Sequence, residues 1–242
     1  MGISFVFSLF FLFRANRGEI SFWKTAIIVS VTGWMSIVGA RLFHVLFERG
    51  DYFYKNPEQI FSQFDGMTFY GALFLGCLSF FILIKLFNFS QTHEKRLWDD
   101  GTLMLTLTLL LMRLGCFANG CCWGKISASL FSVRYFDPRS VMPYFGIPVH
   151  PVQIYDAFWA LCLLVFFVIL RKEKKATGLH MAWFCILYPL GRFVTEFYRG
   201  DHYRGENIVA FLSVGQILSI LVFIAGCSLL YFSKGTTSSE RR

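Results

Sequence analysis

The chain has 242 residues, of which 55% are hydrophobic and only 16% are charged, and its formal net charge is +8. Charged residues make up about a quarter of a typical water-soluble domain. The low charged fraction of this chain therefore excludes an ordinary soluble domain and indicates a polytopic membrane protein. The basic residues lie mostly between hydrophobic stretches, as expected beside a lipid leaflet. A nucleic-acid-binding protein would gather them on a polar surface interleaved with aromatic side chains, so we expect no nucleic-acid partner.

The first hydrophobic stretch, residues 3–13, is too short to cross a bilayer unaided. Its helix would rise about 16 Å, whereas the hydrocarbon core is about 30 Å thick. It has neither the basic start nor the cleavage site of a signal peptide, so we interpret it as a partial or reduced first span. Six later stretches are long enough, or nearly so, to cross: 25–47, 67–88, 102–118, 152–170, 179–198 and 208–232.

These stretches predict an all-α polytopic integral membrane protein with about seven transmembrane helices, the first one short, in a single domain of residues 1–242. Several are bounded by turn or charge signals such as "QTHEKRLWDDG" and "RKEKKATG". Alternating the connections puts most of the 23 lysines and arginines on one side, which the positive-inside rule makes cytoplasmic. We therefore expect the N-terminus outside, the C-terminus inside, and an external loop at about 123–149. A loop of that length is either a lid or binding arm or a plain solvent loop.

Three of the seven cysteines lie close together in "RLGCFANGCCWGK", at the outer end of the span 102–118. The other four lie alone in apolar stretches, where a thiol behaves as a small hydrophobe. For Cys116, Cys121 and Cys122 we consider a disulfide from Cys116 to either of the others, a zinc site completed by His150, and a membrane thiol oxidoreductase acting on the oxidising outer face. The spacing matches neither a Cys-x-x-Cys redox pair nor a common zinc site.

Ionisable residues inside or at the ends of spans are the anomalies that point to function. Each costs a few kcal/mol or more unless it faces a polar cavity or a partner. Arg41 and His44 are three residues apart and so lie on one helix face, and Arg192 and Glu196, four apart, are close enough to pair. Further such residues are Arg113, which closes its span, and His150 and Asp156, which flank the start of the next one.

The arginines in the spans suggest an anion-binding pocket. If Arg41, Arg113 and Arg192 converge, their guanidinium groups offer a fixed fork of donors that suits phosphate, and the inferred ligand is a phospholipid headgroup. Arg199 and Arg204 lie near the predicted membrane surface, where we interpret them as arginines that extend their heads to water or that form structural ion pairs.

Five motifs, in chain order, resemble those of bacterial prolipoprotein diacylglyceryl transferases. "GARLFHVLF" is similar to their G-x-R-x-x-Y-V-L-F, "DGMTFYGA" to G-G-M-S-F-H-G-G, and "RLGCFANGCCWGK" to G-R-x-G-N-F-x-N-G-E-x-x-G. "HPVQIYD" resembles H-P-x-Q-L-Y-E, and "GRFVTEFYRGD" resembles R-x-x-x-E-F-x-R. The resemblance implies an inner-membrane enzyme, without metal or organic cofactor. It would move the diacylglyceryl group of phosphatidylglycerol onto the lipobox cysteine thiol of a preprolipoprotein and release glycerol phosphate.

The same resemblance implies the site residues. The essential arginines fall on Arg113 and Arg192, Glu196 orients Arg192, and Gly124 lets the chain pack closely beside the headgroup. The implied catalytic residues are Arg113, Arg192, His44, Tyr70 and Glu196, and the implied substrate-binding residues are Arg113, Arg41, Tyr188, Gly124, Asn119, His150 and Gln153.

Five substitutions depart from the family pattern, one of them Met112 in place of the glycine before the signature arginine. Tyr70 stands where the family has a histidine, and His44 stands where it has a tyrosine; Cys116 and Cys121 replace the motif asparagine and glutamate. A tyrosine with a pKa near 10 is a poor base at neutral pH. We hypothesise that imidazole and phenol have exchanged helices, so that His44 activates the thiol, with His150 as the alternative base. The lost side chains also leave open a phospholipid transporter or binding protein without transfer activity.

Overall fold

The computed structural model describes residues 2–16, 20–48, 50–58, 60, 66–143, 145–173, 177–200 and 212–239, and its regular elements among them are helices. No strand occurs among these residues, and the β-structure there consists of isolated bridges. Five helices are long and apolar enough to cross a membrane. The predicted all-α membrane architecture is therefore confirmed.

The chain divides into two units. Unit 1 contains the described residues up to Glu94, and unit 2 contains those from Lys95 onward. Helix α6 (Gln91–Asn119) begins in the first unit and runs through the second. The functional residues named from the sequence are distributed over both units.

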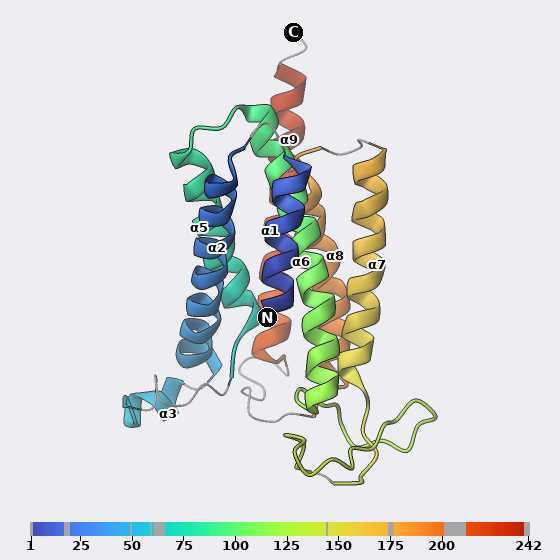
Figure 1. Ribbon diagram of the computed structural model, residues 1–242. Helices are drawn as coiled ribbons and strands as arrows, with labels where there is room; N and C mark the ends of the chain where they lie inside the picture. The colour runs from blue at the N-terminus through green and yellow to red at the C-terminus, as the bar shows by residue number, and fades with distance from the viewer. Residues whose placement is uncertain are drawn as a thin grey trace. The chain divides into compact units, whose positions relative to one another are not determined.

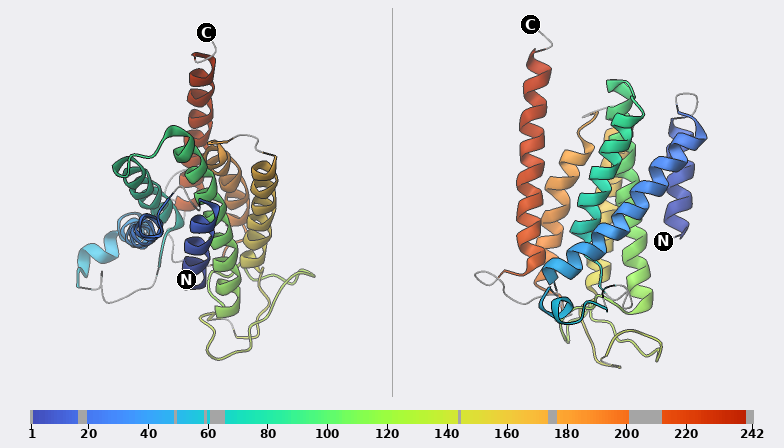
Figure 2. Two further views of the ribbon diagram at one scale, coloured as in Figure 1. Left: turned by 45° about the horizontal axis from the view of Figure 1, so that its top comes forward. Right: turned by 90° about the vertical axis from the view of Figure 1, so that its left-hand side faces the viewer.

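Unit 1 is built on two helices that pack along their length, α2 (Phe22–Phe43) and α5 (Phe69–Leu86). Helix α1 (Gly2–Ala15) packs against α2 and runs in the opposite direction (Figure 2). After Phe43 the chain continues as one π-helical turn, η1 (His44–Glu48), which is followed by the short helix α3 (Gly50–Lys55). Such π-helical turns are rare and occur frequently at functional sites.

Glycines let α2 and α5 approach closely. A Cβ atom at Gly39 would overlap the carbonyl oxygen of Gly71, and one at Gly71 would overlap that of Gly39. Small residues of this kind are typical of helix packing in membranes, where close backbone approach provides the contact. The close approach of the two helices is therefore specified by the sequence at these two positions.

We expect Gly39→Ala to lower the thermal stability of the protein in detergent, because the added methyl meets backbone of α5 that cannot rotate away. Gly33→Ala in the same helix is the matched control, since nothing lies within 4 Å of a Cβ at that position. There alanine should be neutral or stabilising, because it favours a helix over glycine by about 1 kcal/mol. Equal melting temperatures for the two variants would contradict this account of the packing.

Unit 2 consists of α6, α7 (Val152–Lys172), α8 (His180–Glu196) and α9 (Val214–Ser239), which run alongside one another with alternating directions (Figure 1). Helix α8 packs against both α7 and α9. Close approach again depends on glycine: a Cβ at Gly191 would overlap the indole of Trp159. That indole donates a hydrogen bond to the carbonyl of Leu187, at 3.1 Å, within the turn that precedes Pro189.

Helix α6 differs from the prediction, because it begins at Gln91 and includes all of "QTHEKRLWDDG", which we had interpreted as a boundary before residue 102. Its charges are used in packing. Asp99 accepts hydrogen bonds from the backbone N–H groups of Gly178, at 2.7 Å, and His180, at 3.2 Å, and so caps α8, while Asp100 pairs with Arg171 of α7 at 2.9 Å. Because Asp99 and Asp100 have partners outside α6, their charges are accommodated within the helix and do not end it.

Two predicted spans are shorter than the others. Helix α8 has 17 residues and α1 has 14, and neither belongs to the five candidate spans. At 1.5 Å per residue, α8 rises about 26 Å and α1 about 21 Å. Among its described residues, the connection between α6 and α7 contains no helix, and it carries the bridges Ile126 to Val149 and Val133 to Val149.

Candidate functional site

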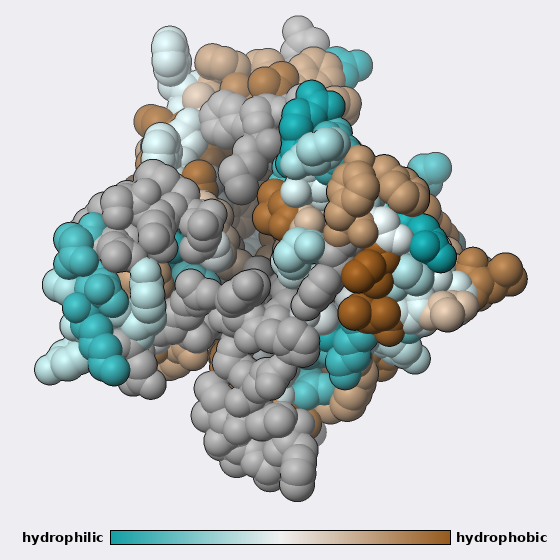
Figure 3. Space-filling model, turned by 90° about the horizontal axis from the view of Figure 1, so that it is seen from below, coloured by the Kyte–Doolittle hydropathy of each residue, from teal (hydrophilic) through white to brown (hydrophobic). Residues whose placement is uncertain are grey.

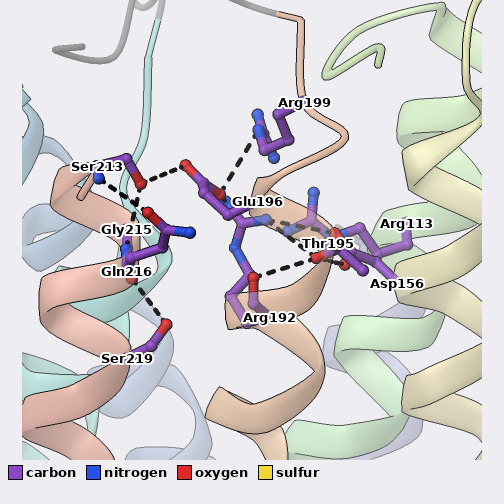
Figure 4. Close-up of polar contacts among 10 residues, drawn as sticks. All are labelled: Arg113, Asp156, Arg192, Thr195, Glu196, Arg199, Ser213, Gly215, Gln216 and Ser219. Carbon is purple, nitrogen blue, oxygen red and sulfur yellow. Dashed lines mark hydrogen bonds and ion pairs between the residues drawn. The ribbon is translucent and has the colours of Figure 1, made fainter. Parts of the chain in front are cut away.

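Arg113 of α6 and Arg192 of α8 meet at one carboxylate, that of Asp156 on α7 (Figure 4). The Nε atom of Arg113 lies 3.2 Å from Oδ2 of Asp156, and Nη1 of Arg192 lies 4.0 Å from the same oxygen. The hydroxyl of Thr195 donates a 2.7 Å hydrogen bond to Oδ1. Both arginines are only 6% exposed, so three helices bring two guanidinium groups and one carboxylate together in a buried place.

Glu196 extends this network toward α9. It forms an ion pair with Arg192, four residues earlier on the same helix, as the spacing predicted. Its Oε1 accepts a hydrogen bond from the hydroxyl of Ser213 at 3.1 Å, and its Oε2 lies 4.0 Å from Nε of Arg199. Glu196 therefore fixes the Arg192 head group from one side, while Asp156 contacts it from the other.

The start of α9 is shaped to receive Glu196. Ser213 and Gln216 form a capping box, in which the Gln216 N–H donates to the Ser213 hydroxyl at 3.2 Å and the Ser213 N–H donates to the Gln216 side chain at 3.0 Å. A Cβ atom at Gly215 would lie only 3.0 Å from Oε1 of Glu196. The motif "SVGQ" thus provides both a helix start and room for the carboxylate.

The charges of this cluster do not balance. The three guanidinium groups of Arg113, Arg192 and Arg199 face the two carboxylates of Asp156 and Glu196, so these five side chains together carry one excess positive charge. All three arginines are at most 7% exposed. A buried charge is costly unless it is paired, so this arrangement favours the binding of an anion.

Tyr188 lies one helical turn before Arg192 and is buried, with its ring stacked on Phe184 at a centroid separation of 5.2 Å. Its phenol interacts with the charges of both Arg113 and Arg192. Three residues predicted from the motifs, Tyr188, Arg192 and Glu196, are thus brought together by α8.

The loop that follows α6, at residues 123–125, holds Arg199 in place through backbone pairing. Gly124 and Arg199 form a β-bridge, the Lys125 N–H donates to the carbonyl of Tyr198 at 2.8 Å, and the Gly200 N–H donates to that of Trp123 at 3.1 Å. A Cβ at Gly124 would lie 2.5 Å from the carbonyl oxygen of His150. The close packing at Gly124 that we predicted beside a headgroup is therefore, in the structure, packing against protein backbone.

His150, Gln153 and Asn119 surround this loop. Nδ1 of His150 lies 3.1 Å from the hydroxyl of Tyr155, and its ring packs on Tyr198. Gln153 is 1% exposed, and its amide donates to the carbonyl of Cys121 at 2.7 Å and to the hydroxyl of Tyr135 at 3.4 Å. Asn119 is exposed, and its backbone carbonyl accepts a hydrogen bond from the N–H of Val141. These residues shape the loop around the arginine cluster.

The remaining predicted site residues, Arg41, His44 and Tyr70, belong to unit 1. The Arg41 guanidinium donates to the carbonyl of Ile60 at 3.1 and 2.8 Å and to that of Gly66 at 3.4 Å. His44 and Tyr70 are 4% and 5% exposed. The His44 ring packs against Gly66, whose φ of +86° favours glycine and whose missing Cβ leaves room for the imidazole.

The three clustered cysteines converge as free thiols. The sulfur atoms of Cys116, Cys121 and Cys122 all lie within 4.8 Å of one another. Among the residues that the structure describes, this is the group that could hold a metal ion, and His150 does not belong to it. The zinc site completed by His150, considered from the sequence, therefore does not correspond to this geometry.

Sequence reasoning missed part of the cluster. Arg199 is 7% exposed, so it does not extend its head to water; it forms the structural pair that we considered, with Nε 4.0 Å from Oε2 of Glu196. Arg204 lies outside the described residues. Asp156 stood out as a charge at the start of a span but received no role, and Thr195 showed no signal at all. The tertiary contact with Arg113 and Arg192 is what identifies both.

Comparison with known proteins gives a consistent result over nearly the whole chain. Residues 2–232 match the family model described as "Prolipoprotein diacylglyceryl transferase". A phosphatidylglycerol–prolipoprotein diacylglyceryl transferase of Campylobacter curvus is 34% identical over 214 residues, 82% of this chain and 73% of the relative. The phosphatidylglycerol–prolipoprotein diacylglyceryl transferase 2 of Clostridium perfringens is 30% identical over 231 residues, which are 94% of this chain and 86% of the relative. One of Dehalococcoides mccartyi is 27% identical over 220 residues, 90% and 81% of the two chains.

Proposed function

The chain belongs to the prolipoprotein diacylglyceryl transferase family, and we propose that it transfers the diacylglyceryl group of phosphatidylglycerol to the thiol of a preprolipoprotein lipobox cysteine. In this reaction a thioether forms at the glyceryl carbon, the thiol loses its proton, and the phosphodiester oxygen leaves with glycerol phosphate. The site must therefore hold a phosphate and remove a proton.

The observation that supports this proposal most strongly is the excess positive charge among buried arginines. A phosphatidylglycerol headgroup carries one negative charge on its phosphodiester, which matches the difference between the three guanidinium groups of Arg113, Arg192 and Arg199 and the two carboxylates of Asp156 and Glu196. Guanidinium donors in a water-poor place stabilise charge that develops on a leaving phosphate oxygen. We assign Arg113 and Arg192 this role.

Asp156 and Glu196 are positioning residues in this proposal. Each carboxylate contacts Arg192 from a different side, and Asp156 also holds Arg113, so the two guanidinium planes are set before the lipid arrives. Preorganised donors need not rearrange during the reaction, which is the main source of electrostatic catalysis. We propose Tyr188, Asn119, His150 and Gln153 as further substrate-binding residues in unit 2, with Gly124 allowing the close packing of their loop. The substrate contact expected for Arg41, in unit 1, stays a prediction.

We place the chain in the bacterial inner membrane as one transmembrane catalytic domain with seven spans, α1 and α8 being the short ones. The orientation is N-terminus outside and C-terminus cytoplasmic. Support for it comes from the basic residues at the end of unit 2 opposite the arginine cluster, which are Lys95, Arg96, Arg171 and Lys172. The positive-inside rule makes that end cytoplasmic and puts the arginine cluster near the outer face.

The loop at 123–149 is the binding arm in this proposal. Large apolar side chains stand exposed on it, and hydrophobic residues lie among hydrophilic ones on the face of the molecule shown in Figure 3. The most exposed of them are Ile126, Leu130, Phe131, Phe136 and Phe145. Exposed aromatic and aliphatic side chains beside a membrane favour contact with the lipid interface or with an apolar signal peptide.

The proposed activity is tested by incubating the purified protein with phosphatidylglycerol vesicles and a peptide that contains a lipobox cysteine. We expect mass spectrometry to show the peptide with one diacylglyceryl group, and the same peptide with serine in place of cysteine to stay unmodified. Lipid binding without any peptide modification would instead support a phospholipid-binding relative that lacks transfer.

We propose His44 as the base that activates the substrate thiol, since Tyr70 occupies the position of the family histidine. His44→Gln should reduce transfer to background while leaving lipid binding intact, and Tyr70→Phe should have a smaller effect because a phenol is a poor base at neutral pH. The measurement is the initial rate of peptide modification against pH. A wild-type rate for His44→Gln would remove His44 as the base and make His150 the candidate.

A further inference from the structure

The end of α6 is built so that two cysteine side chains meet. The Gly120 N–H donates to the carbonyl of Phe117 at 3.2 Å and the Cys121 N–H donates to that of Cys116 at 3.1 Å, with Gly120 at a φ of +68°. These two bonds and the left-handed residue define a Schellman motif. In this motif the residues that share the longer bond bring their side chains together, so the five-residue separation places the thiols of Cys116 and Cys121 side by side.

The third thiol joins them through an unusual backbone conformation. Cys122 has a φ of +60°, which is uncommon for a residue other than glycine and is found mainly where the surrounding structure imposes it. The neighbouring backbone is fixed, because Gln153 holds the carbonyl of Cys121 at 2.7 Å and Gly124 bridges to Arg199. As a result the three sulfur atoms lie within 4.8 Å of one another.

We propose that Cys116, Cys121 and Cys122 bind one thiophilic d¹⁰ cation, Zn²⁺ or Cu⁺, through three thiolates. In a tetrahedral site with metal–sulfur bonds of about 2.3 Å the sulfur atoms stand about 3.8 Å apart, a separation that the cluster reaches with small side-chain rotations. Soft thiolate ligands select such metals over hard cations such as Mg²⁺. Three protein ligands leave one coordination position open on Zn²⁺ and complete a trigonal site for Cu⁺.

The surroundings favour this use of the cysteines. All three side chains are partly buried, so a cation from solution can reach them while the protein still shields the site. Metal binding requires deprotonated thiols. A disulfide would use only two of the three sulfur atoms, and the observed geometry gathers all three.

The test is a titration of the purified, reduced protein in detergent with Cd²⁺ as a spectroscopic probe, followed by competition with Zn²⁺ and Cu⁺. We expect an ultraviolet thiolate-to-cadmium band that saturates at one ion per chain and is not displaced by excess Mg²⁺. Replacing any one of the three cysteines with serine should weaken binding by more than about 100-fold, because even the loss of an outer hydrogen-bond partner of a ligand costs 10- to 100-fold.

The matched control is the double variant Cys162→Ser and Cys227→Ser, which removes two exposed cysteines on other helices and should leave the titration unchanged. Far-ultraviolet circular dichroism shows whether the cluster variants remain helical. The proposal is overturned if the wild-type protein shows no band, or if the band survives in the variant without all three clustered cysteines. It is also overturned if the three thiols resist alkylation until a reductant is added, which would indicate a disulfide.

Discussion

Arg113→Gln is expected to lower the rate of diacylglyceryl transfer by about 10²- to 10³-fold, the cost of removing one preorganised donor from a developing oxyanion. Arg113 lies 3.2 Å from Asp156 and is 6% exposed, so no mobile side chain or bulk water takes its place. The transfer rate of Arg113→Lys should lie between those of the wild-type protein and Arg113→Gln, because lysine keeps the charge but loses the planar fork that binds two phosphate oxygens. The measurement is the initial rate of peptide modification at saturating phosphatidylglycerol.

The matched control for this variant is Arg171→Gln. Arg171 forms an ion pair between α7 and α6 as well, at 2.9 Å from Asp100, but lies at the opposite end of the helices and is more exposed. Its loss should leave the transfer rate unchanged. If Arg113→Gln kept the wild-type rate at equal protein level, or if both variants lost activity to the same extent, Arg113 would have a structural role and the proposed headgroup site would be wrong.

Asp156→Asn is expected to destabilise the protein by about 3–5 kcal/mol, the usual cost of breaking a buried ion pair from one side. The carboxylate serves Arg113, Arg192 and Thr195 together, so its removal leaves two buried guanidinium groups that repel each other. Thermal unfolding in detergent measures the effect. Added phosphatidylglycerol should raise the melting temperature of this variant more than that of the wild-type protein, because the lipid phosphate replaces the missing negative charge.

Two comparisons make the Asp156 result interpretable. Asp137→Asn breaks the exposed pair between Asp137 and Arg139 in the loop and should leave the melting temperature unchanged, since such pairs contribute little. A zwitterionic lipid should not reproduce the stabilisation by phosphatidylglycerol. An Asp156→Asn variant as stable as the wild-type protein, with no added response to anionic lipid, would mean that the arginine cluster does not carry excess charge.

The parts of the site that follow from local geometry were predicted correctly. Residues four apart on a helix always share a face, so the Arg192–Glu196 pair could be predicted from the spacing alone. Tyr188, which the family resemblance implied, lies one turn earlier on α8. Asp156 and Thr195 could not be assigned, because their roles arise from contacts between α7 and α8 that no local spacing encodes. The burial of Arg199 could not be predicted for the same reason: it depends on backbone pairing with Gly124.

The sequence by itself determined that this protein is an α-helical membrane protein of a known transferase family, because low charge, long apolar stretches and ordered motifs are properties of the chain and not of its packing. The tertiary structure alone decided which charges meet. It joined Arg113, Asp156 and Arg192 from three helices, buried Arg199, and, together with the turn after α6, gathered three thiols. Burial and long-range partners set the free energy of a charged group, and both are fixed only when helices pack.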